Sequence, residues 1–175
     1  MLQKNDGKIF ENNNLLIGDW MPLLYRVLKE NTHAYVMTNF LNLEEMMMEA
    51  KKAGFLIHNL LIWEKNNVTP SRWYMKNAEY TLFIRKGKSK PINNLGSKTV
   101  HQFDNIIGSK THPTEKPVDL MKLYVGNSSE LGQVVLDPFM GTGSTGIACK
   151  ELGRRFIGIE KDKSYFDVAR MRLQE

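Results

Sequence analysis

The residues best suited to chemistry lie in the segment VVLDPFMGTGSTG, which runs from Val134 to Gly146. Its apolar start ends in Asp137, and further glycines follow at Gly141 and Gly143. Glycine permits a tight turn and lets backbone amides approach a ligand closely, because it has no Cβ atom. The pattern predicts a buried strand, a ligand-binding turn and the start of a helix.

A second acidic residue, Glu160, follows Gly141 by 19 residues and ends the stretch FIGIE. A carboxylate at the end of the next strand can accept hydrogen bonds from both hydroxyl groups of a ribose. Three glycines and an acid at this distance are more than a simple turn needs. They favour a site for a cofactor that contains a nucleoside.

The letters GTGSTG also fit the G-x-G-x-x-G fingerprint of dinucleotide-binding enzymes, so an NAD-type or flavin oxidoreductase is one alternative. Asp137, Pro138 and Phe139, however, separate the strand from the glycines. A carboxylate at the strand end suits a cationic amino-acid moiety better than a pyrophosphate, because opposite charges attract. Charge complementarity therefore favours S-adenosylmethionine.

A second motif, KTHPTEKP, occupies residues 110–117, ahead of the glycine-rich segment. HPTEKP followed by DPFMGTGSTG and FIGIE resembles the DNA amino-methyltransferases in which the catalytic motif precedes the cofactor motif. The resemblance extends from about Trp20 to the end of the chain, because LLIWEKNN and RWYMKNAEYTLFIRKGK are similar to the middle strands of that family. Phage-type and restriction-type adenine methyltransferases are the most similar members.

The resemblance implies a set of residues that bind S-adenosylmethionine. In the family, the H-P-x-x-K-P segment helps to close the cofactor pocket. The implied residues are His112, Thr114, Lys116, Asp137, Phe139, Gly141, Gly143, Ser144, Thr145 and Glu160. Taken alone, the short motif would fit a proline-delimited loop before a helix equally well.

The catalytic tetrapeptide of the family, D/N/S-P-P-Y/F/W, has no counterpart in the sequence. Its polar residue accepts hydrogen bonds from the target amino group, and its aromatic ring stacks on a base flipped out of the duplex. The tetrapeptide is expected near residues 7–19, where the sequence is GKIFENNNLLIGD, and the chain contains no Pro-Pro pair. We therefore predict no catalytic residue, and we interpret Asp19 and Trp20 as a helix start.

Two hypotheses follow, and both treat the chain as a family member that begins after its catalytic motif. The first is a site-specific DNA methyltransferase that transfers methyl from S-adenosylmethionine to an exocyclic amino group, with adenine as the favoured base and cytosine as the nearest variant; DNA and a complementary N-terminal fragment are its expected partners. The second is a catalytically inactive or split-gene fragment that binds S-adenosylmethionine, DNA or both.

Cations and aromatic side chains are interleaved between residues 72 and 110, a mixture that suits phosphate contacts and base stacking. The predicted DNA contacts are Arg72, Lys86, Lys88 and Lys90, interleaved with Trp73, Tyr74 and Tyr80. In the family a variable target-recognition segment precedes the H-P-x-x-K-P motif, and residues 86–110 occupy that position. A solvated basic loop is the alternative interpretation.

Hydrophobic periodicity indicates which elements position these residues. Residues 20–28 have apolar positions at helical spacing, and Asn42 with Glu45 resembles an N-capping pair for a helix that ends at Gly54. Predicted strands cover residues 34–37, 55–63 and 78–85. The nearly unbroken apolar run 55–63 is typical of a strand covered on both faces of a parallel sheet.

The remaining elements alternate as in a βαβ unit. They are a helix from about Pro117, a strand over residues 134–136, a helix over 144–152, a strand over 155–159 and a helix from about Asp162. Residues 86–110 show no sustained hydrophobic periodicity of a helix or a strand and are expected to form a loop. We predict an α/β Rossmann-like S-adenosylmethionine-dependent methyltransferase fold with a parallel-rich sheet, helices on both faces and a missing N-terminal strand. A single domain over residues 1–175 is expected, with 86–110 as an insert.

Composition adds weaker constraints. The net charge of +5 and the isoelectric point of about 9.2 agree with a polyanionic partner such as DNA. The single cysteine, Cys149, excludes an intramolecular disulfide, and no apolar stretch reaches the length of a membrane span. The start MLQKNDGK lacks the apolar core of a signal peptide, so we expect a cytoplasmic protein. The four histidines form no metal-ligand pattern, and no metal is predicted.

Overall fold

The computed structural model describes residues 15–106 and 115–174. The chain divides into two compact units, Met1–Pro91 with Ser97–Gln102, and Ile92–Gly96 with Phe103–Glu175. One domain over the whole chain therefore stays a prediction.

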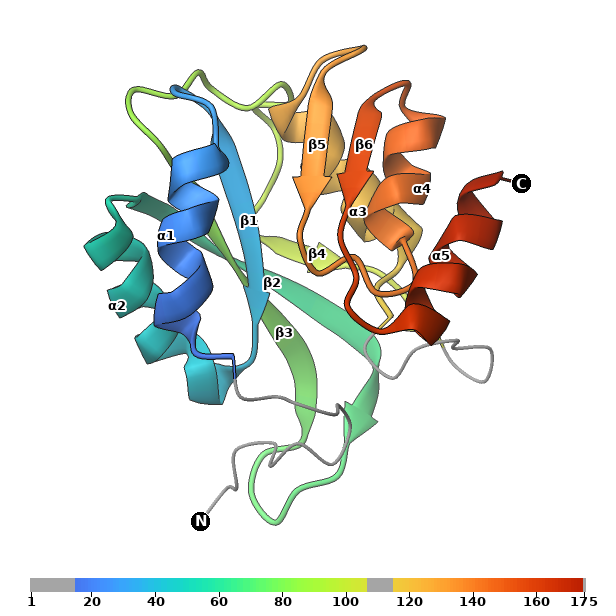
Figure 1. Ribbon diagram of the computed structural model, residues 1–175. Helices are drawn as coiled ribbons and strands as arrows, with labels where there is room; N and C mark the ends of the chain where they lie inside the picture. The colour runs from blue at the N-terminus through green and yellow to red at the C-terminus, as the bar shows by residue number, and fades with distance from the viewer. Residues whose placement is uncertain (1–14, 107–114, 175) are drawn as a thin grey trace. The chain divides into compact units, whose positions relative to one another are not determined.

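The first unit is a four-stranded sheet with two helices (Figure 1). Its elements are α1 (Ile17–Val27), β1 (His33–Thr38), the 3-10 helix η1 (Phe40–Asn42), α2 (Leu43–Ala53), β2 (Leu56–Thr69), β3 (Lys76–Arg85) and β4 (Val100–Gln102). The strand order is β1-β3-β2-β4. Strand β3 is antiparallel to both β1 and β2, whereas β4 is parallel to β2.

The core of this unit lies between the sheet and helices α1 and α2. Leu82 and Ile84 of β3 belong to it and are fully buried, as are Met21 of α1 and Ala50 of α2. Successive strand side chains point to opposite faces, so the equally buried Thr81 lies on the other face of the sheet. Both faces of β3 are therefore covered.

Three expectations for the first unit need correction. Residues 56–63 of the predicted strand lie in β2, which pairs antiparallel with β3 and parallel with β4, so the expectation of an all-parallel environment is wrong. Asn42 is the N-cap residue of α2 as predicted, but its side chain makes no capping hydrogen bond; the Asn39 side chain caps η1 instead and accepts a hydrogen bond from the Asn42 N–H at 3.1 Å. Within the expected loop, Val100–Gln102 form β4 because they extend the sheet along β2. Gly54, with φ of 104°, ends α2 as predicted.

The second unit has the βαβ order that the sequence predicts. Its elements are α3 (Val118–Ser128), β5 (Val134–Asp137), α4 (Ser144–Glu151), β6 (Arg155–Gly158) and α5 (Lys163–Gln174). Strands β5 and β6 are parallel and pair from Val134↔Arg155 to Asp137↔Gly158. Residues 92–96 belong here too, because Asn93 Nδ2 donates to the carbonyls of Gly126 and Ser129 at the end of α3 (2.8 and 3.1 Å).

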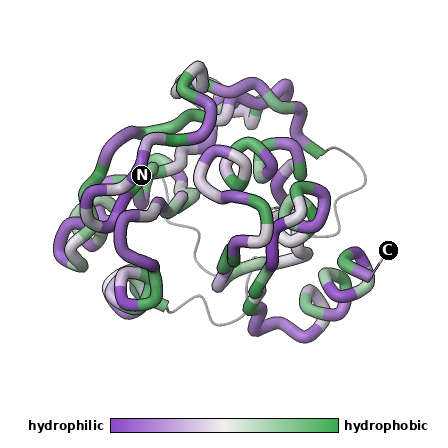
Figure 2. Tube along the Cα trace, turned by 90° about the horizontal axis from the view of Figure 1, so that it is seen from above, coloured by the Kyte–Doolittle hydropathy of each residue, from purple (hydrophilic) through white to green (hydrophobic). Residues whose placement is uncertain are grey.

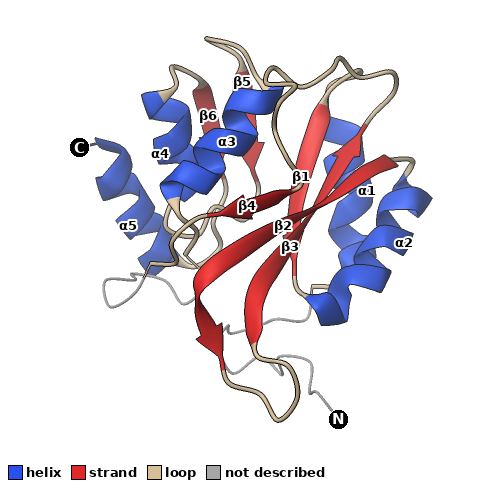
Figure 3. Ribbon diagram, turned by 180° about the vertical axis from the view of Figure 1, so that it is seen from behind, coloured by secondary structure: helices blue, strands red, loops and turns tan. Residues whose placement is uncertain are grey.

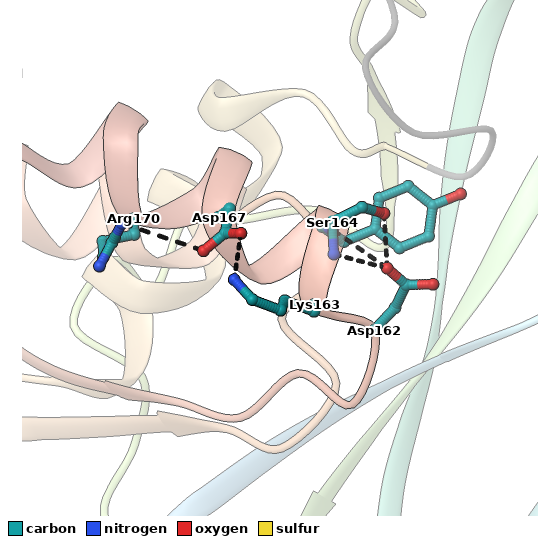
Figure 4. A network of polar contacts seen from close by, with 6 residues as sticks. Asp162, Lys163, Ser164, Asp167 and Arg170 are labelled. Atoms are coloured by element: carbon teal, nitrogen blue, oxygen red, sulfur yellow. Dashed lines mark hydrogen bonds and ion pairs between the residues drawn. The ribbon is translucent and has the colours of Figure 1, made fainter.

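Helix α5 begins at a side-chain cap (Figure 4). Asp162 Oδ1 accepts hydrogen bonds from the backbone N–H of Ser164 (2.8 Å) and from that of Tyr165 (3.3 Å). One turn further along, Lys163 and Asp167 form an exposed ion pair at 2.6 Å. Hydrophilic and hydrophobic residues alternate along this helix beside the C-terminus (Figure 2), and Ala169 is its fully buried residue. The sequence-based start near Asp162 is therefore confirmed.

The described residues, 15–106 and 115–174, exclude two kinds of feature within their ranges. No helix within them is long and apolar enough to cross a membrane. The same residues contain no group of three His, Cys, Asp or Glu side chains that could hold a metal ion. The Cys149 thiol is buried, and burial raises its pKa to about 11.

Candidate cofactor-binding site

The parallel pairing of β5 and β6 brings the two predicted acids to the same edge of their sheet. Asp137 is the last residue of β5 and Glu160 follows the end of β6. The Ile159 N–H donates to the Asp137 carbonyl at 2.9 Å, which continues the pairing past Gly158. Because the carboxyl ends of parallel strands meet at one edge, ligands of open α/β sheets bind there.

Asp137 is held by the turn and by the helix that follows it. Oδ1 accepts a hydrogen bond from the Phe139 N–H at 3.0 Å, and Oδ2 accepts one from Thr145 Oγ1 at 2.6 Å. Burial raises the pKa of the Asp137 carboxyl above its ordinary value, the two hydrogen bonds oppose the rise, and the Glu160 carboxylate adds to it. Within residues 15–106 and 115–174, no cationic side chain lowers the pKa of Asp137.

The glycine turn is the connection between β5 and α4, residues 138–143. Glu160 connects this turn to the segment before α5. Oε2 accepts a hydrogen bond from the Gly141 N–H at 2.9 Å, and Oε1 accepts one from the Asp162 N–H at 2.8 Å. A carboxylate has about four lone-pair positions, so each oxygen retains acceptor capacity. The side chain is thus oriented by the backbone and can still accept hydrogen bonds from a ligand.

The glycine turn needs its glycines for two different reasons. Gly141 and Gly143 have φ of 53° and 83°, the left-handed region that favours glycine. Gly146 lies in α4, where an added Cβ would be 2.7 Å from Cε1 of Phe156 and 2.8 Å from Cδ2 of Leu173. The first two glycines shape the turn, and the third permits close packing.

The other predicted residues of this segment lie around the same turn. Ser144 is the first residue of α4 and is buried, and Thr145 makes the contact with Asp137. The Phe139 side chain is 53% exposed. Lys116 is partly buried and lies just before Pro117, the N-cap residue of α3. His112 and Thr114 lie outside the described residues.

The sequence analysis missed an ion pair with a buried carboxylate that contacts the glycine turn. Arg172 of α5 lies 2.8 Å from Oε1 of Glu115, whose side chain is only 5% exposed. The same Arg172 Nη1 donates to the carbonyl and to Oγ1 of Thr142, at 2.8 and 3.0 Å. Glu115 belongs to the HPTEKP motif, but no sequence spacing indicates an arginine 57 residues later. The HPTEKP motif therefore contributes a positioning residue, Glu115, that was not predicted.

The predicted DNA contacts are all in the first unit but differ in environment. Arg72, Lys88 and Lys90 are exposed. Lys86 instead donates to the carbonyls of Tyr25 and Leu28, both at 3.0 Å, at the C-terminal end of α1. Its ammonium has partners within the protein, which argues against the predicted DNA contact at Lys86.

The geometry fits S-adenosylmethionine. The Asp137 carboxylate is partly buried beside another acid, and a cationic ligand would stabilise its charged form. Glu160 has acceptor capacity for ribose hydroxyls. A pyrophosphate would instead bring further negative charge to two carboxylates, which argues against the dinucleotide alternative.

The comparisons agree with this geometry. A family model described as "DNA methylase" matches residues 3–171. Type II methyltransferase M2.DpnII of Streptococcus pneumoniae is 32% identical, over 94% of this chain and 69% of that protein. Type II methyltransferase M2.LlaDCHI of Lactococcus lactis subsp. cremoris is 31% identical, over 95% and 69%.

A solved structure shows that the fold is also similar to that of a known methyltransferase. The crystal structure of an M1.HpyAVI-SAM complex superposes with a TM-score of 0.79 and 31% identity, over 91% of this chain and 84% of that one. The predicted methyltransferase fold and its cofactor, S-adenosylmethionine, are thus confirmed. The family match, the two relatives and the arrangement of Asp137 and Glu160 around the glycine turn show that the chain belongs to the DNA methylase family of S-adenosylmethionine-dependent DNA N-methyltransferases.

Proposed function

We propose that this chain is the cofactor-binding part of a site-specific DNA adenine methyltransferase. One observation carries the proposal: Asp137 and Glu160 stand at adjacent parallel strand ends and are fixed by hydrogen bonds to the glycine turn and to α4. A site whose groups are already oriented loses little entropy on binding.

Each acid has a distinct task in this proposal. S-adenosylmethionine supplies a methyl group on a positively charged sulfur. The Asp137 carboxylate binds the cationic amino-acid part of the cofactor, while Glu160 accepts hydrogen bonds from the ribose. Methyl transfer to an amine is an in-line displacement, so the main task of the protein is to hold both reactants close and aligned.

Adenine is proposed as the base because the HPTEKP and DPFMGTGSTG motifs resemble adenine methyltransferases of phage and restriction systems. The test is to digest methylated DNA and identify the product nucleoside by mass spectrometry. N6-methyladenine is expected. N4-methylcytosine would contradict the choice of base while leaving the methyltransferase assignment in place.

We further propose that a complementary segment supplies the catalytic tetrapeptide, which this sequence lacks. Within the described residues, β5 pairs only with β6, and a sheet of two strands is marginally stable in water. Apolar side chains on this sheet are exposed, namely Val134, Leu136 and Ile157, and so is Ile159 just after β6. A further strand along β5, with its connection, would pair the free edge and cover apolar surface.

The alternative is a chain that binds S-adenosylmethionine or DNA without methylating it. The missing tetrapeptide favours this alternative, because no residue is then assigned to receive the target amine. Incorporation of radioactive methyl groups into duplex DNA distinguishes the two. Incorporation by the chain alone would contradict both the alternative and the need for a complementary segment.

The cofactor site is tested first by calorimetric titration with S-adenosylmethionine. We expect binding to the unmodified chain and its loss in Asp137→Ala and in Glu160→Ala. Asp119→Ala is the matched control, because that acid lies on the exposed surface of α3 and should leave binding unchanged. Failure of the folded, unmodified chain to bind would contradict the proposal.

The cellular location is part of the same proposal. A DNA methyltransferase has to reach chromosomal or phage DNA, which agrees with the predicted cytoplasmic location. Fractionation of cells that produce the full-length natural protein is the test. Recovery in a membrane fraction would contradict the prediction.

A further inference from the structure

Among the described residues of the first unit, the connection between β2 and β3 carries the most exposed large apolar side chains. We define the hairpin tip as residues 68–76. Trp73 and Tyr74 are 83% and 94% exposed, and the neighbouring Met75 and Val68 are also exposed. Exposure of large apolar side chains side by side is costly in water and commonly marks a binding surface.

The hairpin tip extends beyond its sheet. Strand β1 ends opposite Tyr80 of β3, and β4 pairs with β2 only up to Glu64. The last residues of β2 and the first of β3 therefore form a two-stranded ribbon without neighbours in the described sheet, and Figure 3 shows its loop reaching past the other strands. Such a ribbon has dimensions that the major groove of duplex DNA admits.

The charged side chains within residues 65–78 are all positive. Residues 65–78 contain three cations, Lys65, Arg72 and Lys76, and no acidic residue. Lys65 is paired with Glu79, just outside this stretch. Among the described residues, neither Arg72 nor Lys76 forms an ion pair, and both are exposed. Their charges are available to phosphate groups.

The turn conformation presents these residues together. The Trp73 N–H donates to Ser71 Oγ at 3.2 Å, which orders the turn just before the aromatic pair. Arg72 precedes that pair and Lys76 follows it after Met75. Cations beside stacking rings suit nucleic acid, because the rings contact bases while the cations contact the backbone.

We propose that the hairpin tip is a docking element that enters a groove of duplex DNA. Arg72 and Lys76 contact phosphates, and the rings of Trp73 and Tyr74 contact the base edges or stack on an opened step. The proposal rests on the proposed function, since it requires DNA as substrate. It extends the predicted contact at Arg72 to a two-stranded ribbon that includes Lys76, separate in sequence from the Lys88 and Lys90 contacts predicted in the 86–110 segment.

The test measures binding of the full chain to a fluorescein-labelled duplex by anisotropy over a range of salt concentrations. Two double variants separate the two parts of the tip. Arg72→Gln/Lys76→Gln should weaken binding. It should also make the slope of log affinity against log salt concentration less steep by about 1.8, at about 0.9 per phosphate contact. Trp73→Ala/Tyr74→Ala should weaken binding about tenfold with the salt dependence unchanged.

Each double variant has a matched control. Lys51→Gln/Lys52→Gln removes two positive charges from the last turn of α2, away from the hairpin. Leu131→Ala removes a side chain that is 78% exposed but lies between α3 and β5. Both controls should bind DNA within about twofold of the unmodified chain, because neither touches the tip.

Three outcomes would overturn the proposal. One is unchanged affinity in both tip variants. Another is an equal loss in the lysine control, which would show a general effect of net charge. The third is a change of oligomeric state in Trp73→Ala/Tyr74→Ala by sedimentation, with DNA affinity retained, which would identify a second copy of the chain as the occupant. If the unmodified chain binds S-adenosylmethionine but no DNA, the DNA part of the proposed function fails together with the tip.

Discussion

The glycine turn of the second unit and the hairpin tip of the first place their polar groups in opposite ways. Around the turn, both carboxylates already accept hydrogen bonds from the backbone or from Thr145. At the tip, Arg72 and Lys76 are exposed. One region is ordered before any ligand arrives, whereas the other presents long side chains to solvent.

The difference follows from what each region has to bind. A small cofactor is distinguished by a few groups at fixed positions, so the site gains from being oriented in advance. Phosphate contacts on DNA carry no sequence information directly and tolerate long, adaptable side chains. Substitutions should therefore change stability strongly around the turn and weakly at the hairpin.

The largest effect is expected at Arg172. Arg172→Met removes the cation that contacts the nearly buried Glu115 and the Thr142 carbonyl. Loss of one partner from a buried ion pair costs about 3 kcal/mol, because the other charge stays desolvated. Urea denaturation should show this decrease in the free energy of unfolding.

Arg170→Met is the control for that variant, because Arg170 lies on the same helix, is exposed and is 4.0 Å from Asp167. It should change the stability by less than about 0.5 kcal/mol. The double variant Glu115→Gln/Arg172→Met should regain part of the lost stability, since no buried charge is left. Equal losses for the two single arginine variants would mean that the ion pair does not support the turn.

The next largest effect is expected at Asp137, and it has opposite signs for binding and stability. Asp137→Asn keeps the shape but removes the charge, so affinity for S-adenosylmethionine should fall by roughly 10- to 100-fold, as for a lost hydrogen bond to a charged group. The cofactor-free protein should become more stable at neutral pH. Calorimetry and urea denaturation measure the two effects.

The sign of the stability change comes from the pKa. Burial raises the pKa of folded Asp137 above its ordinary value of 3.8. The folded chain then binds a proton more tightly than the unfolded chain, so stability decreases as pH rises from the unfolded pKa through the folded one. The variant should lack this decrease. If the stability of Asp137→Asn still decreases with rising pH as that of the unmodified protein does, Asp137 is not the group responsible for the decrease.

A smaller effect is expected at Lys86 in the first unit. Lys86→Met keeps the apolar stem but removes the donor to the Tyr25 and Leu28 carbonyls, which end α1. The loss should be about 1 kcal/mol, the usual contribution of a cation at a helix C-terminus. Lys88→Met is the exposed control and should be nearly neutral in thermal unfolding. If both variants lose equally, Lys86 is not a helix cap.

The smallest effect on stability is expected at Glu79, which pairs with Lys65 in the hairpin. Glu79→Gln should change stability by less than about 1 kcal/mol, as for partly exposed ion pairs. It also makes the hairpin more positive, so anisotropy should show DNA affinity higher by about twofold. Lower affinity would count against DNA as the occupant of the hairpin tip.

Local sequence predicted the second unit well. Strands, glycine turn and helices follow one another within residues 134–174, and the acids at Asp137 and Glu160 lie where the spacing places them. Local predictions succeed here because a βαβ unit pairs strands that are close in sequence. Asp19 behaves as interpreted too, since its carboxylate accepts a hydrogen bond from the Leu16 N–H at the start of α1.

Pairings over long sequence distances were harder to predict. The three residues of β4 have no strand signature of their own and are ordered by β2, whose residues 62–64 lie almost forty positions earlier. Likewise, Glu115 and Arg172 show no sequence relation, and Lys86 looked like a free cation. Each of these depends on a partner that only folding brings near.

By itself, the sequence determined the family and the cofactor chemistry, because the glycines, Asp137 and Glu160 form a local pattern that only a few ligands fit. The tertiary structure decided which charges are available. It buries Glu115 against Arg172, commits Lys86 to α1 and leaves Arg72, Trp73 and Tyr74 exposed on a ribbon. The physical reason is that burial and exposure are properties of packing between distant segments, which no local pattern of residues contains.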